Sequence, residues 1–538
     1  MTSSLVRGRP RRVAAQIRVR VAHAVVGAVI GTGWLALPVM TVGAGDPVPV
    51  APDRPVASAA AADQDDTSAT DLLMPLVVVG AAGVLAGYGY LRRTRRARTR
   101  TTPGLVSTAP PVPTPAESER QARAALVLAD DCVRGCKEEL PFVADRFGEE
   151  AVEPFRHAVR AAETELAAAF AIWGRYEEGV PAEASARRQA LVGVVGRCAE
   201  AGRRLDSEAD AMDRLRGLEE GVDGALAVAE RRFRDLTART AAAHGTASAL
   251  HDRYGPSAAE PVIGSVEQAK DRLVFATSQL NEARQAADAH DDRRAARHLR
   301  AAEGAIAQAG VLVGGVERLA AELREAAGMV PAALTGAEAE IAAARKGDAP
   351  VSLTAGELHA RLAHADGVLA AVREELTAGP YDPVDALRRI ARAVERLEVG
   401  RSGVIEAAAL LVARSTVGEA EDYVTVHRGA VGAEARTRLS AAIRTLDGGT
   451  ATVSAKTSGM SLREPPGHSA EADTLAREAR DLAERDVRTH GNPYAASAPL
   501  PAGLPGAVLG GILLTEDPDA GPPTTFGGPQ TRNRLHLH

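Results

Sequence analysis

Apolar residues recur every three or four positions through most of the chain, from residue 114 to residue 489. This spacing places them along one face of a helix, as in amphipathic helices that bury a single stripe. Alanine, leucine, arginine and glutamate, which favour helices, are frequent in the same region. We therefore predict an all-α region over residues 114–489, built of helices about 25–35 residues long that short turns connect.

Capping signals mark where these helices begin. Thr114, Pro115 and Glu117 combine a capping hydroxyl, a proline suited to the first helical position and a carboxylate that reaches back. The same pattern predicts further helix starts at Ser265 with Gln268, Thr335 with Glu338, Thr354 with Glu357, and Asp382-Pro383. Glycine and proline predict breaks near Gly148, Gly179 to Pro181, Gly255-Pro256, Gly328, Gly347 and Gly379-Pro380.

One apolar spacing, i, i+4, i+7 and i+11, occurs three times. The three sets are Ala295, Leu299, Ala302 and Ile306; Ala386, Ile390, Ala393 and Leu397; and Ala472, Ala476, Ala479 and Ala483. Each set predicts the inner stripe of a helix, and in the first two an upstream helix can pack against it across a short turn. Stacked helix hairpins resemble α-solenoid units, although Ala-rich helices also produce this spacing by chance. The predicted architecture is an elongated helical bundle, coiled-coil or solenoid-like.

Residues 72–91 form the strongest apolar segment, twenty positions from Leu72 to Leu91 without a charge. That length is about what a helix needs to cross the hydrocarbon core of a membrane. Aspartates precede the segment, and six arginines follow it within residues 92–100. Because Lys and Arg accumulate on the cytoplasmic side, we predict one membrane helix with the bulk of the chain in the cytoplasm.

The N-terminal residues 1–45 contain a basic stretch and then an apolar stretch from Val21 to Leu37. This order predicts a secretory signal peptide, or alternatively a first membrane helix that is not cleaved. Residues 46–71 then form a short extracytoplasmic linker. After the span, residues 92–113 form a basic juxtamembrane and Pro-rich linker, whose arginines also suit anionic lipid headgroups. The predicted location is the cell membrane, with a single pass after signal cleavage.

Composition and charge limit the partners of the helical region. The chain has only 7 Phe, 7 Tyr and 2 Trp among 538 residues, so we expect thin, alanine-lined contacts between helices. Residues 1–100 carry 13 arginines against 6 acidic residues, whereas the remainder carries 51 basic against 64 acidic residues. An acidic helical region argues against nucleic acid, which clustered cations recognise. The predicted partners are the lipid bilayer and either another protein or a second copy of this chain.

No catalytic, cofactor-binding or metal-binding residue is predicted. The sequence lacks GxxxxGK[ST], HExxH and GxSxG motifs. Cys132 and Cys136 share a helical face, and with Cys198 they are expected to be buried thiols, redox sensing or metal binding being the alternatives. The remaining candidates are expected to be solvated or half-buried side chains: the histidines His359 and His364, and the carboxylate pairs Glu149-Glu150 and Glu374-Glu375.

Residues 490–538 are rich in glycine and proline and are predicted to be a disordered tail. Residues 506–514 form a short apolar patch that is too short to span a bilayer. The patch can dock onto the helical bundle or onto a partner. His536 and His538 end the tail and could bind metal only adventitiously.

Five strings stand out in the chain downstream of the basic string RRTRRARTRTTPG. They are LPFVADRFGEEAVEPF (residues 140–155), GSVEQAKDRLVFATSQLNEARQA (264–286), GPYDPVDALRRI (379–390), HRGAVGAEARTRL (427–439) and GNPYAASAPLPAGLPGAVLGGILL (491–514). From Leu72 to Leu514 the chain resembles the cytoplasmic helical part of actinobacterial TPM domain-containing membrane proteins. In that family the TPM domain, linked to phosphatase activity in some members, lies between signal and membrane helix. Here the interval Asp46 to Asp71 is too short for a domain of about 150 residues, so the TPM domain itself is missing.

These observations predict a membrane-anchored helical scaffold or interaction protein without catalysis of its own. The alternative is a degenerate accessory member of the TPM-domain envelope phosphatase family, acting with a separate protein. A third hypothesis is lipid remodelling by amphipathic helices, which the net acidity of the helical region disfavours.

Overall fold

The computed structural model describes residues 113–218, 220–348, 354–397, 403–457, 467–490 and 525–535. All described residues belong to one compact unit within residues 110–538. The predicted signal, extracytoplasmic linker and membrane helix Leu72–Leu91 therefore lie outside the described residues. Within the described residues, no helix is both long enough and apolar enough to cross a bilayer.

The described residues are predominantly helical and contain no strand, which confirms the all-α prediction for them. The longer helices are α3 (Pro115–Phe147), α4 (Glu149–Glu177), α5 (Ala184–Arg216), α6 (Asp223–Arg253), α8 (Ser265–Asp288), α9 (Asp292–Ala343), α10 (Ala355–Ala378), α11 (Pro383–Glu395), α12 (Gly403–Val426), α13 (Ala433–Thr457) and α14 (His468–Thr489). Short elements are α7 (Pro256–Ala259), the turns η1 (Glu260–Val262) and η2 (Ala344–Asp348), and α15 (Pro529–Leu535).

Several predicted helix starts are confirmed. The Thr114 hydroxyl accepts a hydrogen bond from the Glu117 backbone N–H, and the Glu117 carboxylate accepts one from the Thr114 N–H, which completes the capping box. Thr354 caps α10 by accepting from the Glu357 N–H at 3.3 Å. Asp382 caps α11 by accepting from the Asp385 N–H at 3.0 Å.

The predicted start at Ser265 is confirmed, but its capping role is wrong, and one further predicted start and one predicted break are wrong. Ser265 is the first residue of α8, and Gly264 occupies the N-cap position without a side-chain cap. Thr335 lies inside α9, where its hydroxyl donates to the carbonyl oxygen of Pro331 at 3.2 Å. Gly328 is also helical, so α9 continues for 52 residues rather than the predicted 25–35.

The three predicted inner stripes are buried, and all twelve of their residues are at most 4% exposed. The first stripe lies in the packing of α9 against α8, and the second lies in a core that α11 shares with α9. The third lies on α14 and faces α12 and α13. The prediction of alanine-lined contacts is thereby confirmed.

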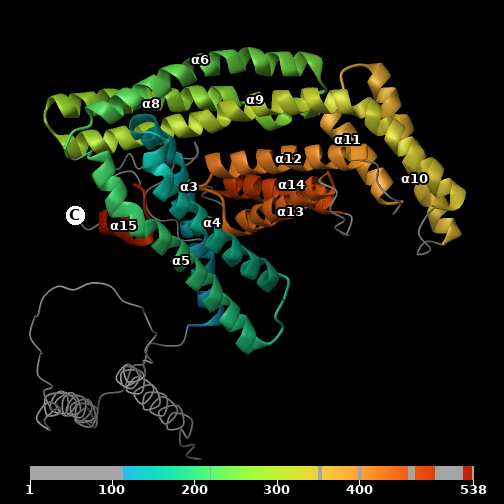
Figure 1. Cartoon of the computed structure of the whole chain (residues 1–538), viewed down its shortest axis with the longest axis horizontal. Coiled ribbons are helices and arrows are strands. Elements are labelled where there is room, and N and C mark those ends of the chain that lie inside the picture. Colours follow the sequence, from blue (N-terminus) through green and yellow to red (C-terminus); the bar gives the residue numbers. More distant parts are fainter. Residues whose placement is uncertain are drawn as a thin grey trace, which may run out of the picture. The chain divides into compact units, whose positions relative to one another are not determined.

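The helices do not stack as successive hairpins in chain order, which corrects the solenoid-like alternative. Helices α6, α8 and α9 lie side by side, and α12 follows α9 on its other side (Figure 1). Helix α13, near the end of the chain, contacts both α3 and α4, near the start of the described residues. In a solenoid each unit contacts only its neighbours in the sequence.

Buried ion pairs join helices that are distant in the sequence. Arg216, on α5, is 3% exposed and donates to Glu139 of α3 and, at 2.7 Å, to Glu303 of α9. Arg436, on α13, pairs with Asp130 of α3 at 2.5 Å. Both arginines place their charge in an apolar surrounding where unpaired charges are costly, so they fix how these helices are placed against one another.

Candidate functional site

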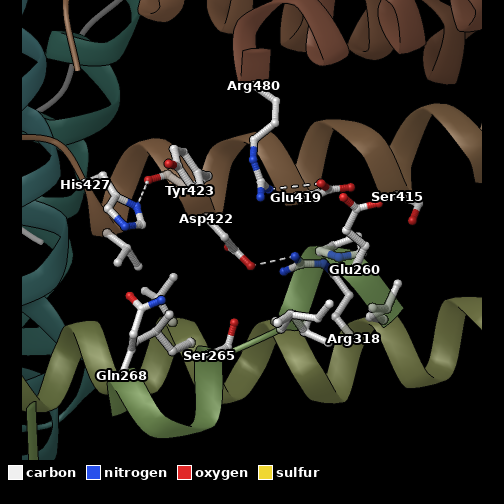
Figure 2. A pocket seen from close by; sticks show the side chains of 18 of the residues that line it. Glu260, Ser265, Gln268, Arg318, Ser415, Glu419, Asp422, Tyr423, His427 and Arg480 are labelled. Carbon is white, nitrogen blue, oxygen red and sulfur yellow. Dashed lines mark hydrogen bonds and ion pairs between the residues drawn. The ribbon is translucent and has the colours of Figure 1, made fainter. Parts of the chain in front are cut away.

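A polar pocket lies between α9, α12 and α14 and is closed on one side by the turn that leads into α8; we call it the α12 pocket (Figure 2). Its volume is about 110 Å³. The side chains that define its chemistry come from four segments: Glu260 and Gln268 from around the turn, Arg318 and Glu322 from α9, Ser415, Glu419, Asp422, Tyr423 and His427 from α12, and Arg480 from α14.

The α9 side of the pocket is organised around Arg318. Its Nη2 atom donates to Oδ2 of Asp422 at 2.5 Å across the pocket. Its Nε atom lies 3.6 Å from Oε1 of Glu322, one helical turn away. The hydroxyl of Ser415 donates to the other oxygen of Glu322 at 2.8 Å. These contacts connect α9 to α12 through polar groups.

The α14 side of the pocket is organised around Arg480. Its guanidinium donates to Glu419 at 2.9 Å and to Glu484 at 2.8 Å. It also lies over the ring of Tyr423, 4.1 Å from the ring centre. Tyr423 stacks on His427 with ring centres 4.2 Å apart. Figure 2 shows Arg480 descending from α14 toward Glu419.

Burial determines the protonation of these groups. Burial raises the pKa of Asp422, Glu419 and Glu322, although Arg318, Arg480 and the Ser415 hydroxyl act in the opposite direction. Burial also lowers the pKa of His427, so this imidazole is neutral near pH 7. The two arginines thus offset only part of the cost of burying the charged forms of these three carboxylates.

This arrangement can hold water or a small cationic group through carboxylate oxygens. Among the described residues, no group of three or more His, Cys, Asp or Glu side chains is placed to hold a metal ion. Ser415 is 6% exposed, and its proton is directed at Glu322. The charged contacts in the pocket join α9, α12 and α14, so the pocket residues also hold these three helices together.

A second site is formed by the chain's own end and corrects the prediction that residues 490–538 are disordered throughout. Residues 525–535, the C-terminal segment, pack against α3 and α5 (Figure 1). Phe526 is fully buried in the core of α3, α4 and α5, and its ring meets the edge of Phe155 at 5.6 Å. We call the surface that receives this segment the C-terminal groove.

Asp206 of α5 anchors the start of α15. Its Oδ1 atom accepts hydrogen bonds from the backbone N–H groups of Gly528 at 2.9 Å and Thr531 at 3.0 Å, and from the Thr531 hydroxyl at 2.6 Å. A carboxylate at this position satisfies N–H groups that have no partner within a helix. The short helix is therefore capped by a residue more than 300 positions earlier in the chain.

Glycine permits the close approach of the segment to α5. A Cβ atom on Gly202 would lie 2.6 Å from Cδ of Pro529, and one on Gly528 would collide with the Gly202 carbonyl oxygen. Further along the segment, Arg532 donates to the backbone carbonyl oxygen of Asp131 at 3.2 Å. The groove therefore selects its occupant by shape as well as by polar contacts.

The three cysteines lie at or near this groove. Cys132, Cys136 and Cys198 are free and buried, as expected. Burial raises the pKa of Cys132 to about 11 and that of Cys198 to about 12. The Sγ atom of Cys136 accepts a hydrogen bond from the Gly527 N–H at 3.3 Å, and burial raises the pKa of this thiol too. All three thiols are thus protonated at neutral pH.

The other sequence candidates are not brought together. His359 and His364 are exposed on α10, and Nε2 of His364 lies 3.0 Å from Arg396. Glu149, Glu150 and Glu374 are exposed. Glu375 instead forms a two-point contact with Arg389 that connects α10 to α11, and this hydrogen bonding lowers its pKa. The patch 506–514 and His536 and His538 lie outside the described residues.

Sequence reasoning missed the residues that form both sites. Acidic residues near the end of the otherwise apolar helix α12, such as Asp422, are one available signal for the pocket. For the groove, the signal is Phe526, which follows 250 residues without a phenylalanine and precedes Gly-Gly-Pro.

Comparison with known proteins finds two similar chains. UPF0603 protein MT2410 and UPF0603 protein Rv2345, from two strains of Mycobacterium tuberculosis, are each 29% identical to this chain over 432 residues. The match covers 76% of this chain and 64% of each relative, so the chain spans less than two thirds of the relatives' length. No family model matches the chain. No solved structure matches it either.

Proposed function

We propose that this chain is a membrane-anchored helical scaffold that binds short peptide segments in the C-terminal groove. In this proposal the helix Leu72–Leu91 holds the chain in the cell membrane and the helical unit lies on the cytoplasmic side. The groove supplies the interaction, and the rest of the helical unit positions it. The chain needs no chemistry of its own for this role.

The observation that supports the proposal is the seating of the C-terminal segment. The segment inserts one aromatic ring, Phe526, into the core of the N-terminal helices. Its backbone N–H groups meet the carboxylate of Asp206, and its Gly528-Pro529 pair fits over Gly202. An apolar anchor combined with directed polar contacts is how peptide-binding surfaces recognise a ligand.

The test uses the full chain with its own segment unable to dock. Gly528→Ala adds a methyl group that collides with the Gly202 carbonyl oxygen, which leaves the groove open. A fluorescent peptide of residues 522–538 should then bind the variant saturably, measured by anisotropy. The same peptide with Phe526→Ala should bind about 100-fold more weakly, since removing a buried phenylalanine costs about 3 kcal/mol or more.

The control is the double variant Gly202→Ala/Gly528→Ala, in which the groove is obstructed as well. It should not bind the wild-type peptide. Absence of binding to the Gly528→Ala chain, with its helicity intact by circular dichroism, would refute the peptide-binding function. Phosphate release by the pure full chain would instead favour the accessory phosphatase alternative, because a scaffold alone releases none.

A further inference from the structure

The C-terminal segment is attached to its groove only through contacts that another copy could provide equally well. Its described polar partners lie on α3 and α5, more than 300 positions earlier in the chain. Residues 491–524, which connect it to α14, number 34 and can span at most about 120 Å at the largest rise per residue. The segment can therefore reach the groove of a neighbouring copy that lies within this distance of the end of α14.

We propose that the C-terminal groove accepts the segment of a second copy of this chain, so that two copies exchange residues 525–535 and form a closed dimer. This inference rests on the proposed function, because it names the peptide that the groove binds. Each copy carries one groove and one segment, and reciprocal exchange leaves neither unoccupied. Exchange of an identical element is an established low-cost route to dimers.

The segment matches the groove too closely for an arbitrary occupant. Phe526 fills a fully buried position, Asp206 receives two backbone N–H groups and one hydroxyl, and Pro529 lies against Gly202, where a side chain would obstruct it. These contacts depend on the sequence of the segment and on the groove, and every copy contains both. A second copy of this chain is therefore a partner that always carries the peptide segment that fits the groove.

Local concentration decides between docking within one chain and exchange between two. A tethered segment experiences an effective concentration of about millimolar from its own groove. Exchange between two copies competes with docking within one chain when the local concentration of copies reaches a similar value, as anchoring in a membrane allows. Since the contacts are the same in both arrangements, the balance shifts with the amount of protein per unit area.

The experiment mixes two complementary full-length variants in detergent, each with a different affinity tag. Gly202→Ala obstructs the groove and keeps an intact segment, whereas Gly528→Ala keeps an open groove and disables its segment. Neither variant can pair with itself, but the open groove of the Gly528→Ala chain can bind the intact segment of the Gly202→Ala chain. We expect the mixed pair to co-purify at least 10-fold more than either variant mixed with a differently tagged copy of itself.

Control variants keep the same residues on the same elements. Gly196→Ala lies on α5 with nothing within 4 Å of its added methyl group, and Gln530→Ala removes an exposed side chain from α15. Both controls should label Cys136 with a thiol reagent as slowly as wild type, because the segment stays docked over the sulfur. The Gly528→Ala variant should label faster. Adding the Gly202→Ala variant should restore slow labelling of Cys136 in the Gly528→Ala copy, which its affinity tag allows to be measured separately.

Two results would overturn the exchange. In one, the mixed pair fails to co-purify although the Gly528→Ala chain binds the free 522–538 peptide; the groove then binds peptide, and only the dimer is refuted. In the other, the mixed pair co-purifies equally well when the intact segment carries Phe526→Ala, so that association does not use the groove. Failure of the free peptide to bind would refute the proposed function and the exchange together.

Discussion

The N-terminal bundle of α3, α4 and α5 and the bundle of α12, α13 and α14 each consist of three helices packed side by side, yet they are held together differently. The first has an aromatic core that includes Phe155, Phe170, Trp173 and Tyr176. The core of the second has no aromatic ring among its buried residues, which are three valines, one leucine and six alanines, Ala420, Ala435, Ala442, Ala476, Ala479 and Ala483. Large side chains keep helices apart and leave space that another segment can fill, whereas alanines let the backbones approach closely.

Both bundles also contain buried charge, such as Arg216 with Glu139 in the first bundle and Asp473 in the second. In the second bundle Asp473 is 2% exposed and accepts hydrogen bonds from Arg388 at 3.1 Å, Arg392 at 2.8 Å and the Thr416 hydroxyl at 2.7 Å. An alanine contact buries little apolar area, at about 25 cal/mol per Å². We infer that the alanine-lined bundle depends more on its charged anchor, and the aromatic bundle more on packing.

Removing the largest aromatic side chain should have the largest effect. Trp173→Ala deletes a fully buried ring from the first bundle, and we expect a loss of about 3–5 kcal/mol in the free energy of unfolding. Urea titration of the full chain followed by circular dichroism measures it. Val192→Ala, at a position 71% exposed on α5, is the control and should change little. A loss below 1 kcal/mol would mean that the aromatic core is not what holds this bundle.

Neutralising the charged anchor should have the next largest effect. Asp473→Asn removes the carboxylate that Arg388 and Arg392 share. We expect a loss of about 2–3 kcal/mol, reduced because both arginines are partly exposed and Arg388 keeps Asp385 as a partner. Asp481→Asn, on the exposed face of the same helix, is the matched control. Equal losses from the two substitutions in urea titrations would contradict a special role for Asp473.

Enlarging an alanine tests the close approach itself. Ala479→Leu inserts three carbon atoms where α14 faces α12 and α13, and overpacking of this kind costs about 1–3 kcal/mol. Arg485→Leu adds the same side chain on the exposed face of α14 and should be nearly neutral. Thermal unfolding of the two variants compares them. If Ala479→Leu unfolds at the same temperature as Arg485→Leu, close approach of these helices is not required for stability.

The smallest expected effect concerns pH and the α12 pocket. Burial raises the pKa of Glu419 in the folded chain, so the folded state holds this proton to a higher pH than the unfolded state. Stability contributed by this group is therefore fully present below its ordinary pKa and declines as the pH rises through the raised value. Glu419→Gln keeps an acceptor for Arg480 and should flatten that decline by less than about 1 kcal/mol.

Urea titrations of wild type and Glu419→Gln at pH 4.5, 5.5 and 7 measure this difference. The wild type should lose more stability than the variant over that interval. A wild type that instead gains stability relative to the variant would mean that Arg480 outweighs burial at this carboxyl. Glu421→Gln, on the same helix and outside the pocket lining, serves as the control.

Local features of the fold could be read from the sequence, and features that join distant residues could not. Thr114 and Asp382 cap helices as predicted because an N-cap is decided by residues three positions apart. The stripe Ala476, Ala479, Ala483 was predictable because helical spacing alone puts it on one face. The contact between Arg318 and Asp422 joins residues 104 positions apart, and no local pattern encodes it.

Helix α9 illustrates how packing overrides a local signal. Gly328 and Pro331 favour a break, yet Val330 and Ala333 beside them are fully buried in a core shared with α10, α11 and α12. The burial of this face outweighs the cost of a proline inside the helix. The C-terminal groove was equally hidden, since its specificity depends on how Phe526 meets helices from the other end of the described chain.

The continuity of α9 also has a mechanical consequence. At 1.5 Å per residue its 52 residues extend for about 78 Å. Its first half, around Leu299, belongs to one hydrophobic core, and its second half, around Leu323, belongs to another. A helix shared in this way cannot melt in one half without exposing the end of the other. The two cores should therefore unfold together in a single cooperative transition rather than in two separate ones.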